Sequence, residues 1–146
     1  MTPDGMTATR SAFGPKETMD RLQAAITAHG MQVLARIDHA AAAAASGMTL
    51  LPTEVIIFGN PRVGTTLMQA AQTMGIDLPL KALVWQNEAG ETWIGTIDPA
   101  WLAHRHGAAS GTERTIEAMT RALAEVTQAA ATVGDAPRPG PGPAPL

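Results

Sequence analysis

Two histidines of this chain lie where an imidazole could bind a metal or carry a proton. His39 follows Asp38 at the end of a predicted strand, and His106 stands directly before Gly107. The Asp38 carboxylate could orient the His39 imidazole, as carboxylates behind metal-binding histidines do. With Glu54 as a third ligand, His39 and His106 would suit zinc or iron, and either histidine could be an axial ligand of haem. The alternative is that Asp38 only caps a helix begun by His39, and that His106 only precedes a helix-ending glycine.

The segment from Gly59 to Thr66 could bind an anion. It reads GNPRVGTT and looks superficially like a phosphate-binding loop, but it lacks the Gly-Lys-Ser/Thr ending that places a lysine on the phosphates. Arg62 and the free N–H groups at the start of a helix could still bind an anion weakly. The alternative, which we favour, is a helix capped by Asn60 with Pro61 in its first position.

Glu54 is a candidate general acid or base, because it stands among apolar residues of a predicted strand. Pairing with Arg36 on a neighbouring strand is the interpretation that we favour. No G-x-S-x-G nucleophile motif occurs, and the sequence offers no partner nucleophile for Glu54 or His39. We therefore lean against an enzyme, and the sequence identifies no cofactor.

Composition excludes several classes of protein. The chain has 146 residues, enough for one domain with a core, and its 3% aromatic content means that aliphatic residues and methionine must build that core. A net charge of −3 without a basic run argues against a nucleic-acid partner. The absence of cysteine excludes disulfides and thiolate sites. No apolar run approaches the ~20 residues of a membrane span, and we see no signal peptide, so we expect a cytoplasmic protein without a membrane partner.

Residue patterns predict five strands, over Met6–Phe13, Met31–Asp38, Thr53–Phe58, Lys81–Asn87 and Glu91–Ile97. They also predict helices over Pro15–His29, Ala40–Ala45, a segment starting at Pro61, a segment from Asp98 to Gly107, and Thr112–Val133. In the second strand, alternation puts one set of side chains on one face and the rest on the other; the first set is Met31, Val33, Ala35 and Ile37. Ser110 with Glu113 fits a capping box for the last helix.

The hairpin and the short connections predict an α+β domain over residues 1–134, with an antiparallel or mixed sheet covered by helices on one face. Residues 135–146, DAPRPGPGPAPL, predict a disordered tail. Trp85 and Trp93 fall opposite each other in the hairpin and would form a cross-strand pair. If their face is covered, they belong to the core or to a dimer interface. If it is open, Trp101 could join them on a ligand surface.

Several short motifs in the right order give the chain a family resemblance. They are Ile37-Asp38-His39, Pro52-Thr53-Glu54, Phe58-Gly59-Asn60-Pro61 with Gly64-Thr65, Asp77-Leu78-Pro79, Val84-Trp85, Asp98-Pro99 and His106-Gly107. From about Met6 to the last helix, the chain resembles domain-of-unknown-function family 302, a family of uncharacterised bacterial and archaeal domains. The resemblance implies a TBP-like β-α-β-β-β-β-α arrangement with extra short helices, in which a curved antiparallel sheet carries helices on one face. It also implies dimerisation, and it brings no established activity or cofactor. Some relatives look to have Cys at Gly59, so thiol chemistry there does not carry over.

These observations predict a small, homodimeric binding or accessory protein. Its site would form where three element ends come together, for a small molecule, an anion, haem or a metal. The predicted binding residues are Asp38, His39, Glu54, Asn60, Arg62 and His106, with His39 and His106 as metal ligands. Two alternatives stay open: an enzyme with His39 or Glu54 as general base, and a structural or regulatory module that uses the open sheet face.

Overall fold

Five strands form one antiparallel sheet in the order β1-β5-β4-β3-β2. The structure is a computed structural model and describes residues 2–133. The strands are β1 (Met6–Ser11), β2 (Gln32–Asp38), β3 (Thr53–Gly59), β4 (Leu80–Gln86) and β5 (Thr92–Ile97). All five predicted strands are therefore present within one to two residues of the expected bounds. The predicted tail and the domain boundary at residue 134 lie outside the described residues.

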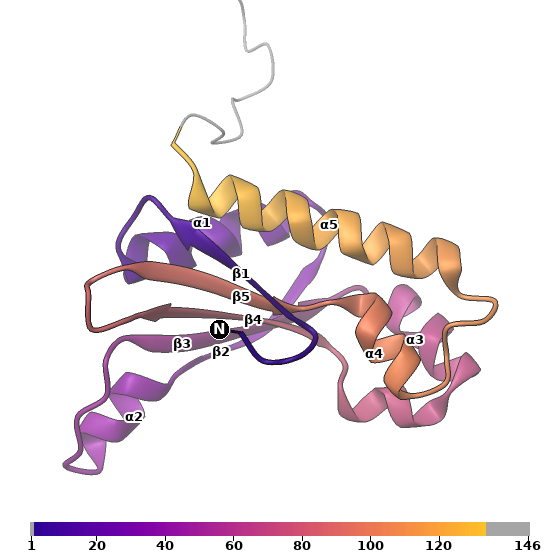
Figure 1. Cartoon of the computed structure of the whole chain (residues 1–146), viewed down its shortest axis with the longest axis horizontal. Helices are drawn as coiled ribbons and strands as arrows, with labels where there is room; N and C mark the ends of the chain where they lie inside the picture. The colour runs from indigo at the N-terminus through magenta and orange to yellow at the C-terminus, as the bar shows by residue number, and fades with distance from the viewer. Residues whose placement is uncertain (1, 134–146) are drawn as a thin grey trace, which may run out of the picture.

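The helices complete the predicted order, β-α-β-β-β-β-α with short helices added. They are α1 (Pro15–Ala28), α2 (His39–Ala45), α3 (Pro61–Ala70), the 3₁₀-helix η1 (Gln72–Ile76), α4 (Pro99–Arg105) and α5 (Glu113–Ala131). Figure 1 shows α1 and α5 on one face of the sheet, and α2 hanging beyond one end on the other side. The predicted α+β class, with helices on one face of an antiparallel sheet, is confirmed. The comparison with TBP stays a prediction.

The core lies between the sheet and the two long helices. Ile56, Phe58, Val84 and Ile94 point from the central strands toward α1 and α5, and all four are fully buried. Each of the two helices contributes an apolar stripe to this core, which on α1 includes Leu22. Each such side chain stabilises the fold by about 1.5–3 kcal/mol relative to an exposed one. This core fixes α1 and α5 on the sheet, and so fixes the space between them and α3.

β2 departs from the predicted alternation at one residue. The expectation placed Val33, Ala35 and Ile37 on one face and Leu34 and Arg36 on the other. In the structure the pairing with β3 shifts between Val33 and Ala35, so that Leu34 is the additional residue of a β-bulge. Because side chains alternate with a period of two, one extra residue exchanges the faces of everything after it. The predicted faces are therefore wrong beyond Leu34.

The exchange turns Arg36 toward the helices. Arg36 pairs with Ile56, whose side chain is buried on the helix-covered face. Ile37 turns to the opposite face, where it is 42% exposed. The bulge thus places a charged side chain at the margin of the core and an apolar one on the open face.

Side chains cap the start of three helices, and the sequence predicted two of these caps, Asp38 and Asn60. In each, a side-chain oxygen accepts a hydrogen bond from a backbone N–H of the first turn, at 2.9 to 3.0 Å. The capping residues are Asp38 for α2, Asn60 for α3 and Asp98 for α4.

The capping box predicted for α5 is wrong. Thr112, not Ser110, is the N-cap, and its side chain makes no cap hydrogen bond. Glu113 instead accepts a hydrogen bond from the backbone N–H of Gly111. The chain turns through Gly111 just before the helix, so Ser110 lies outside the capping position.

Candidate functional site

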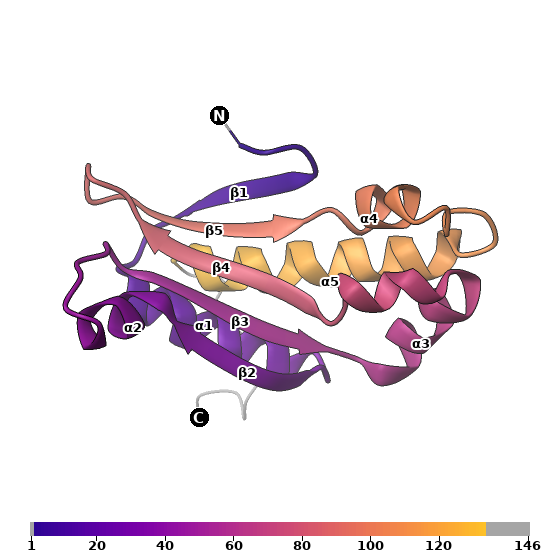
Figure 2. The same ribbon diagram turned by 90° about the horizontal axis from the view of Figure 1, so that it is seen from below.

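The predicted site residues separate into two groups at opposite ends of the sheet. Asp38 pairs with Glu54 at one end of β3, whereas Gln32 pairs with Gly59 at the other end. Glu54 and Gly59 are five residue steps apart along the strand, which is roughly 17 Å at about 3.3 Å per residue. Figure 2 shows α2 at one end of the sheet, and α3 and α4 at the other. The shared hollow expected between the Asp38 end and the Asn60 end does not form.

At the α2 end, Asp38 and His39 have the structural role given above as the alternative to metal binding. The Asp38 carboxylate caps α2 through the N–H of Ala41, and His39 is the exposed first residue of that helix. The described residues contain no group of three His, Asp, Glu or Cys side chains that could hold a metal. His39 and His106 lie at opposite ends of the sheet, so the expectation that they share a metal is wrong.

Glu54 forms the ion pair that we favoured from the sequence. Its two carboxylate oxygens accept hydrogen bonds from Nε and Nη2 of Arg36, both at 3.0 Å. The Nη1 group of Arg36 donates to Asp20 at 3.0 Å and to Gln23 at 2.8 Å, both on α1. The hydrogen bond with Glu54 is the main cause of the raised pKa of Arg36, which burial opposes. Both oxygens of Glu54 are thus engaged by one guanidinium, and the cluster joins α1, β2 and β3 as a structural element.

At the other end, His106 belongs to a cluster that ties η1 to α4. Its Nε2 donates to the Asp77 carboxylate, and its Nδ1 lies 2.9 Å from the Thr73 hydroxyl. Arg105 also donates to Asp77, at 2.6 Å. Burial acts to raise the pKa of Asp77, but the hydrogen bonds and charges of His106 and Arg105 outweigh it and lower that pKa. The hydroxyl–imidazole–carboxylate order resembles a proton relay, but none of its three members lines the cavity described next.

A cavity of about 820 Å³ opens at this end, on the helix-covered side of the sheet. It exists because α1 ends at Ala28 while α5 runs on toward α3, as Figures 1 and 2 show. Its apolar lining comes from the start of β2, from α3, from the link into β4 and from the first half of α5: Met31, Leu34, Pro61, Val63, Met68, Leu78, Pro79, Leu80, Ala118, Met119 and Ala122. The polar lining is His29, Gln32, Asn60, Arg62, Thr65, Thr66, Arg114 and Thr115.

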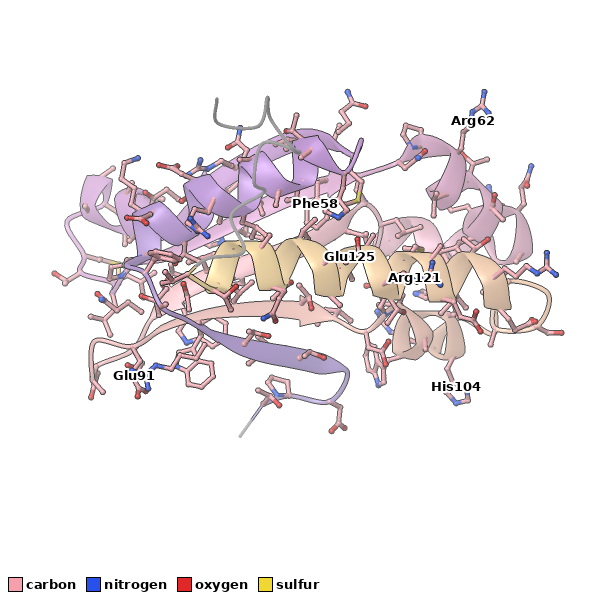
Figure 3. All side chains as sticks on the ribbon, turned by 90° about the horizontal axis from the view of Figure 1, so that it is seen from above. Phe58, Arg62, Glu91, His104, Arg121 and Glu125 are labelled. Carbon is pink, nitrogen blue, oxygen red and sulfur yellow. The ribbon has the colours of Figure 1, made fainter. Side chains whose placement is uncertain are left out.

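Asn60 and Arg62 are the two predicted binding residues that reach this cavity. Asn60 turns the chain from β3 into α3, and Arg62 lies in the first turn of that helix. Figure 3 shows Arg62 extending from α3 away from the ribbon. His29, at the opposite margin, is the C-cap residue of α1, and its Nε2 lies 2.8 Å from Glu125 of α5. The cavity therefore has an apolar interior with polar groups at its margins.

Sequence reasoning missed the larger part of this lining. Met31 directly precedes β2, Met68 lies on α3 and Met119 lies on α5, so no local pattern in the sequence groups them. Only the strand-to-helix junction at Gly59-Asn60-Pro61 carried a usable signal, because such junctions often border ligand sites.

The opposite face of the sheet is apolar and is not covered by any of the long helices of residues 2–133 (Figure 2). Trp85 and Trp93 are direct partners in the β4–β5 ladder, which confirms the predicted cross-strand pair. Both are half-buried. Gly95 lets the Met6 and Trp85 side chains close over the sheet, since a Cβ there would lie 2.1 Å from Met6 Cε. Trp101 packs instead against the turn that precedes β1.

Comparison with known proteins gives a family and a fold. The family model described as "Domain of unknown function DUF302" matches residues 7–126. The solved structure "Crystal structure of uncharacterized conserved protein DUF302 from Bacillus stearothermophilus" is similar with a TM-score of 0.78. Its sequence is 20% identical, and the match covers 88% of this chain and 99% of that one.

Curated relatives are named as channels. "Fluoride-specific ion channel FluC 1" of Brucella suis is 43% identical over 127 residues, which are 87% of this chain and 50% of the relative. The protein of the same name from Brucella abortus is also 43% identical, over 47% of its length. The chain thus spans about half the length of the curated relatives it matches. Across residues 2–133, none of the helices combines the length and the apolar character that crossing a bilayer requires.

Proposed function

This chain belongs to the family described as domain of unknown function DUF302, and we propose that it is a small-ligand-binding accessory protein whose site is the cavity between β2, α3 and α5. The observation that carries this proposal is the cavity itself. A volume of about 820 Å³ falls within the ~300–1,000 Å³ that ligand sites occupy. An apolar interior with a few polar groups at the margin is the usual composition of such sites.

The apolar interior decides which kind of small ligand the cavity suits. Three methionines contribute to it, and their flexible side chains adapt to different shapes: Met31, Met68 and Met119. Bare inorganic ions would gain little from such walls, because they would lose water without finding enough polar partners. Fluoride, which the names of the relatives suggest, therefore fits this cavity poorly. An organic molecule that buries apolar surface fits it better.

A blocking substitution tests this proposal. We propose Ala122→Trp, which places an indole in the cavity from α5, with Ala124→Trp on the exposed side of the same helix as the matched control. The probe is N-phenyl-1-naphthylamine, a neutral apolar dye that brightens when it leaves water. We expect saturable binding to the native chain and to the control, and at least tenfold weaker binding to Ala122→Trp. Equal binding to all three proteins would contradict the proposal.

We also propose that two copies associate through the open face of the sheet. The supporting observation is the row of half-buried apolar side chains on that face, which includes Val55, Leu83, Trp85 and Trp93. Beside it, the connection from α2 to β3 exposes three large apolar side chains, Met48, Leu50 and Leu51, at 68%, 47% and 45%. Contiguous apolar surface of this kind is usually covered by a partner.

Sedimentation velocity tests the second proposal. Leu83→Lys places a charge in the middle of the open face, and Lys81→Leu, on the same face and strand, is a control that adds no charge there. We expect a dimer for the native chain and for the control, and a monomer for Leu83→Lys with an unchanged circular dichroism spectrum. A native chain that stays monomeric at 100-fold different concentrations would contradict dimerisation.

A further inference from the structure

We propose that the ligand of this cavity is an apolar organic anion, with a hydrophobic body inside and one carboxylate or sulfonate group at the margin. This inference rests on the proposed function, since it assigns a chemical class to the same cavity. It is carried by two observations: the charged residues that line the cavity are arginines, and their guanidinium groups have no partners among residues 2–133.

The lining contains cations and no carboxylate. Arg62 and Arg114 both border the cavity, and none of its lining residues within the described chain is Asp or Glu. The protein as a whole has the opposite balance, with 13 acidic residues against 10 basic ones. An approaching anion therefore meets a locally favourable field at this margin, in a chain whose net charge would repel it elsewhere.

Both guanidinium groups are without partners in residues 2–133. Four other arginines there are engaged: Arg10 with Glu91, Arg21 with backbone carbonyls at the end of α5, Arg36 with Glu54 and Asp20, and Arg105 with Asp77. Arg121 also makes no such contact in that range, but it does not line the cavity. Arg62 and Arg114 make no side-chain hydrogen bond or ion pair in that range. Their donors remain free for an anionic group, which guanidinium binds with two parallel hydrogen bonds.

The geometry places the charge at the mouth and not in the interior. Arg62 extends from α3 toward solvent (Figure 3), so it would meet the part of a ligand that emerges into water. The interior presents Met31, Met119 and Leu80, which favour an apolar body. A cation would be repelled at the margin, and a neutral molecule would leave both guanidinium groups unused. An anion with an apolar body uses both parts of the site.

Two dyes with the same aromatic skeleton test this inference. 1-Anilinonaphthalene-8-sulfonate carries one sulfonate, and N-phenyl-1-naphthylamine is its neutral counterpart. We expect the double variant R62Q/R114Q to bind the sulfonate dye roughly tenfold more weakly, since two partly exposed ion pairs together contribute on this scale. The affinity of this double variant for the neutral dye should change by less than about twofold. Arg121→Gln is the matched control, because Arg121 is exposed on α5 and does not line the cavity.

The outcomes of these experiments distinguish the charge assigned to the ligand from the proposal that the cavity binds a ligand at all. If Ala122→Trp abolishes binding of both dyes but R62Q/R114Q leaves the sulfonate dye unchanged, the cavity binds ligands and the assigned charge is wrong. If Arg121→Gln weakens binding of the sulfonate dye as much as R62Q/R114Q does, the effect comes from the net charge of the protein and the inference also fails. If Ala122→Trp affects neither dye, the cavity is not the site and both proposals fail. If R62Q/R114Q loses affinity for the sulfonate dye but not for the neutral dye, the result supports the inference.

Discussion

Replacing Arg36 by Met should destabilise the fold by about 2 kcal/mol, although Arg36 lies at the margin of the core. The substitution keeps the length of the side chain but removes two hydrogen bonds to Glu54 and one each to Asp20 and Gln23. Hydrogen bonds to charged groups contribute about 1.5–3 kcal/mol, and losing the partner of a buried ion costs about 3–5 kcal/mol. The Arg36 and Glu54 side chains are 26% and 21% exposed, so water reduces that cost. The Asp20 side chain is 51% exposed and adds little.

Urea unfolding followed by circular dichroism measures this loss, and a double-mutant cycle assigns it. Arg36→Met, Glu54→Gln and the double variant should give a coupling free energy of at least about 1 kcal/mol, because each single variant removes the same paired interaction. Lys16→Met, an exposed charge on α1, is the control and should change stability by less than about 0.5 kcal/mol. An Arg36→Met loss below about 0.5 kcal/mol, or a coupling near zero, would refute the assignment of this cluster as structural.

Other predictions concern the far end of the sheet, its open face and its core. The pKa of Asp77 is lowered by His106 and Arg105, so this group stabilises the fold above its unfolded-state pKa of about 3.9 and loses that effect as pH falls through the lower folded-state value. Asp77→Asn should therefore be less stable than the native chain at pH 6 and approach it at pH 2–3 in urea titrations; a constant difference across this range would contradict the assignment. Gly95→Val should lower the melting temperature by several degrees, because its side chain would collide with those that close over the sheet; an unchanged melting temperature would show that they move aside freely. Phe58→Ala should cost about 3–5 kcal/mol in the same urea assay, since Phe58 is fully buried, and a cost below about 1 kcal/mol would contradict its place in the core.

The sequence predicts the elements of this fold well because their signals are local. Asn60 and Pro61 mark a helix start within three residues, and the β-branched residues of Thr53–Phe58 mark a strand without knowledge of its neighbours. The bulge at Leu34 was missed for the same reason. Whether an extra residue is accommodated in β2 depends on the register with β3, which is set by contacts distant in sequence.

The site was predicted less well, because convergence of element ends depends on topology. Asp38 and Asn60 each stand at a strand end, but β2 and β3 are antiparallel neighbours, so the end of one lies beside the start of the other. That pairing alone separates the two residues by the length of β3. The cavity also depends on α5 extending beyond the end of α1. No residue pattern in the sequence predicts how far one helix extends past another in the fold.

The central claim is that the cavity between β2, α3 and α5 binds the ligand. Methionine methyl resonances test it most directly, because the chain has methionines both inside and outside this cavity. Of its 8 methionines, Met31, Met68 and Met119 line the cavity, whereas Met6 covers the open sheet face and Met48 is exposed near α2. In ¹³C-methyl-methionine spectra titrated with 1-anilinonaphthalene-8-sulfonate, we predict saturable shifts of the three cavity methyls and little change at Met6 and Met48. Shifts confined to Met6 or Met48 would place the ligand elsewhere and contradict the account.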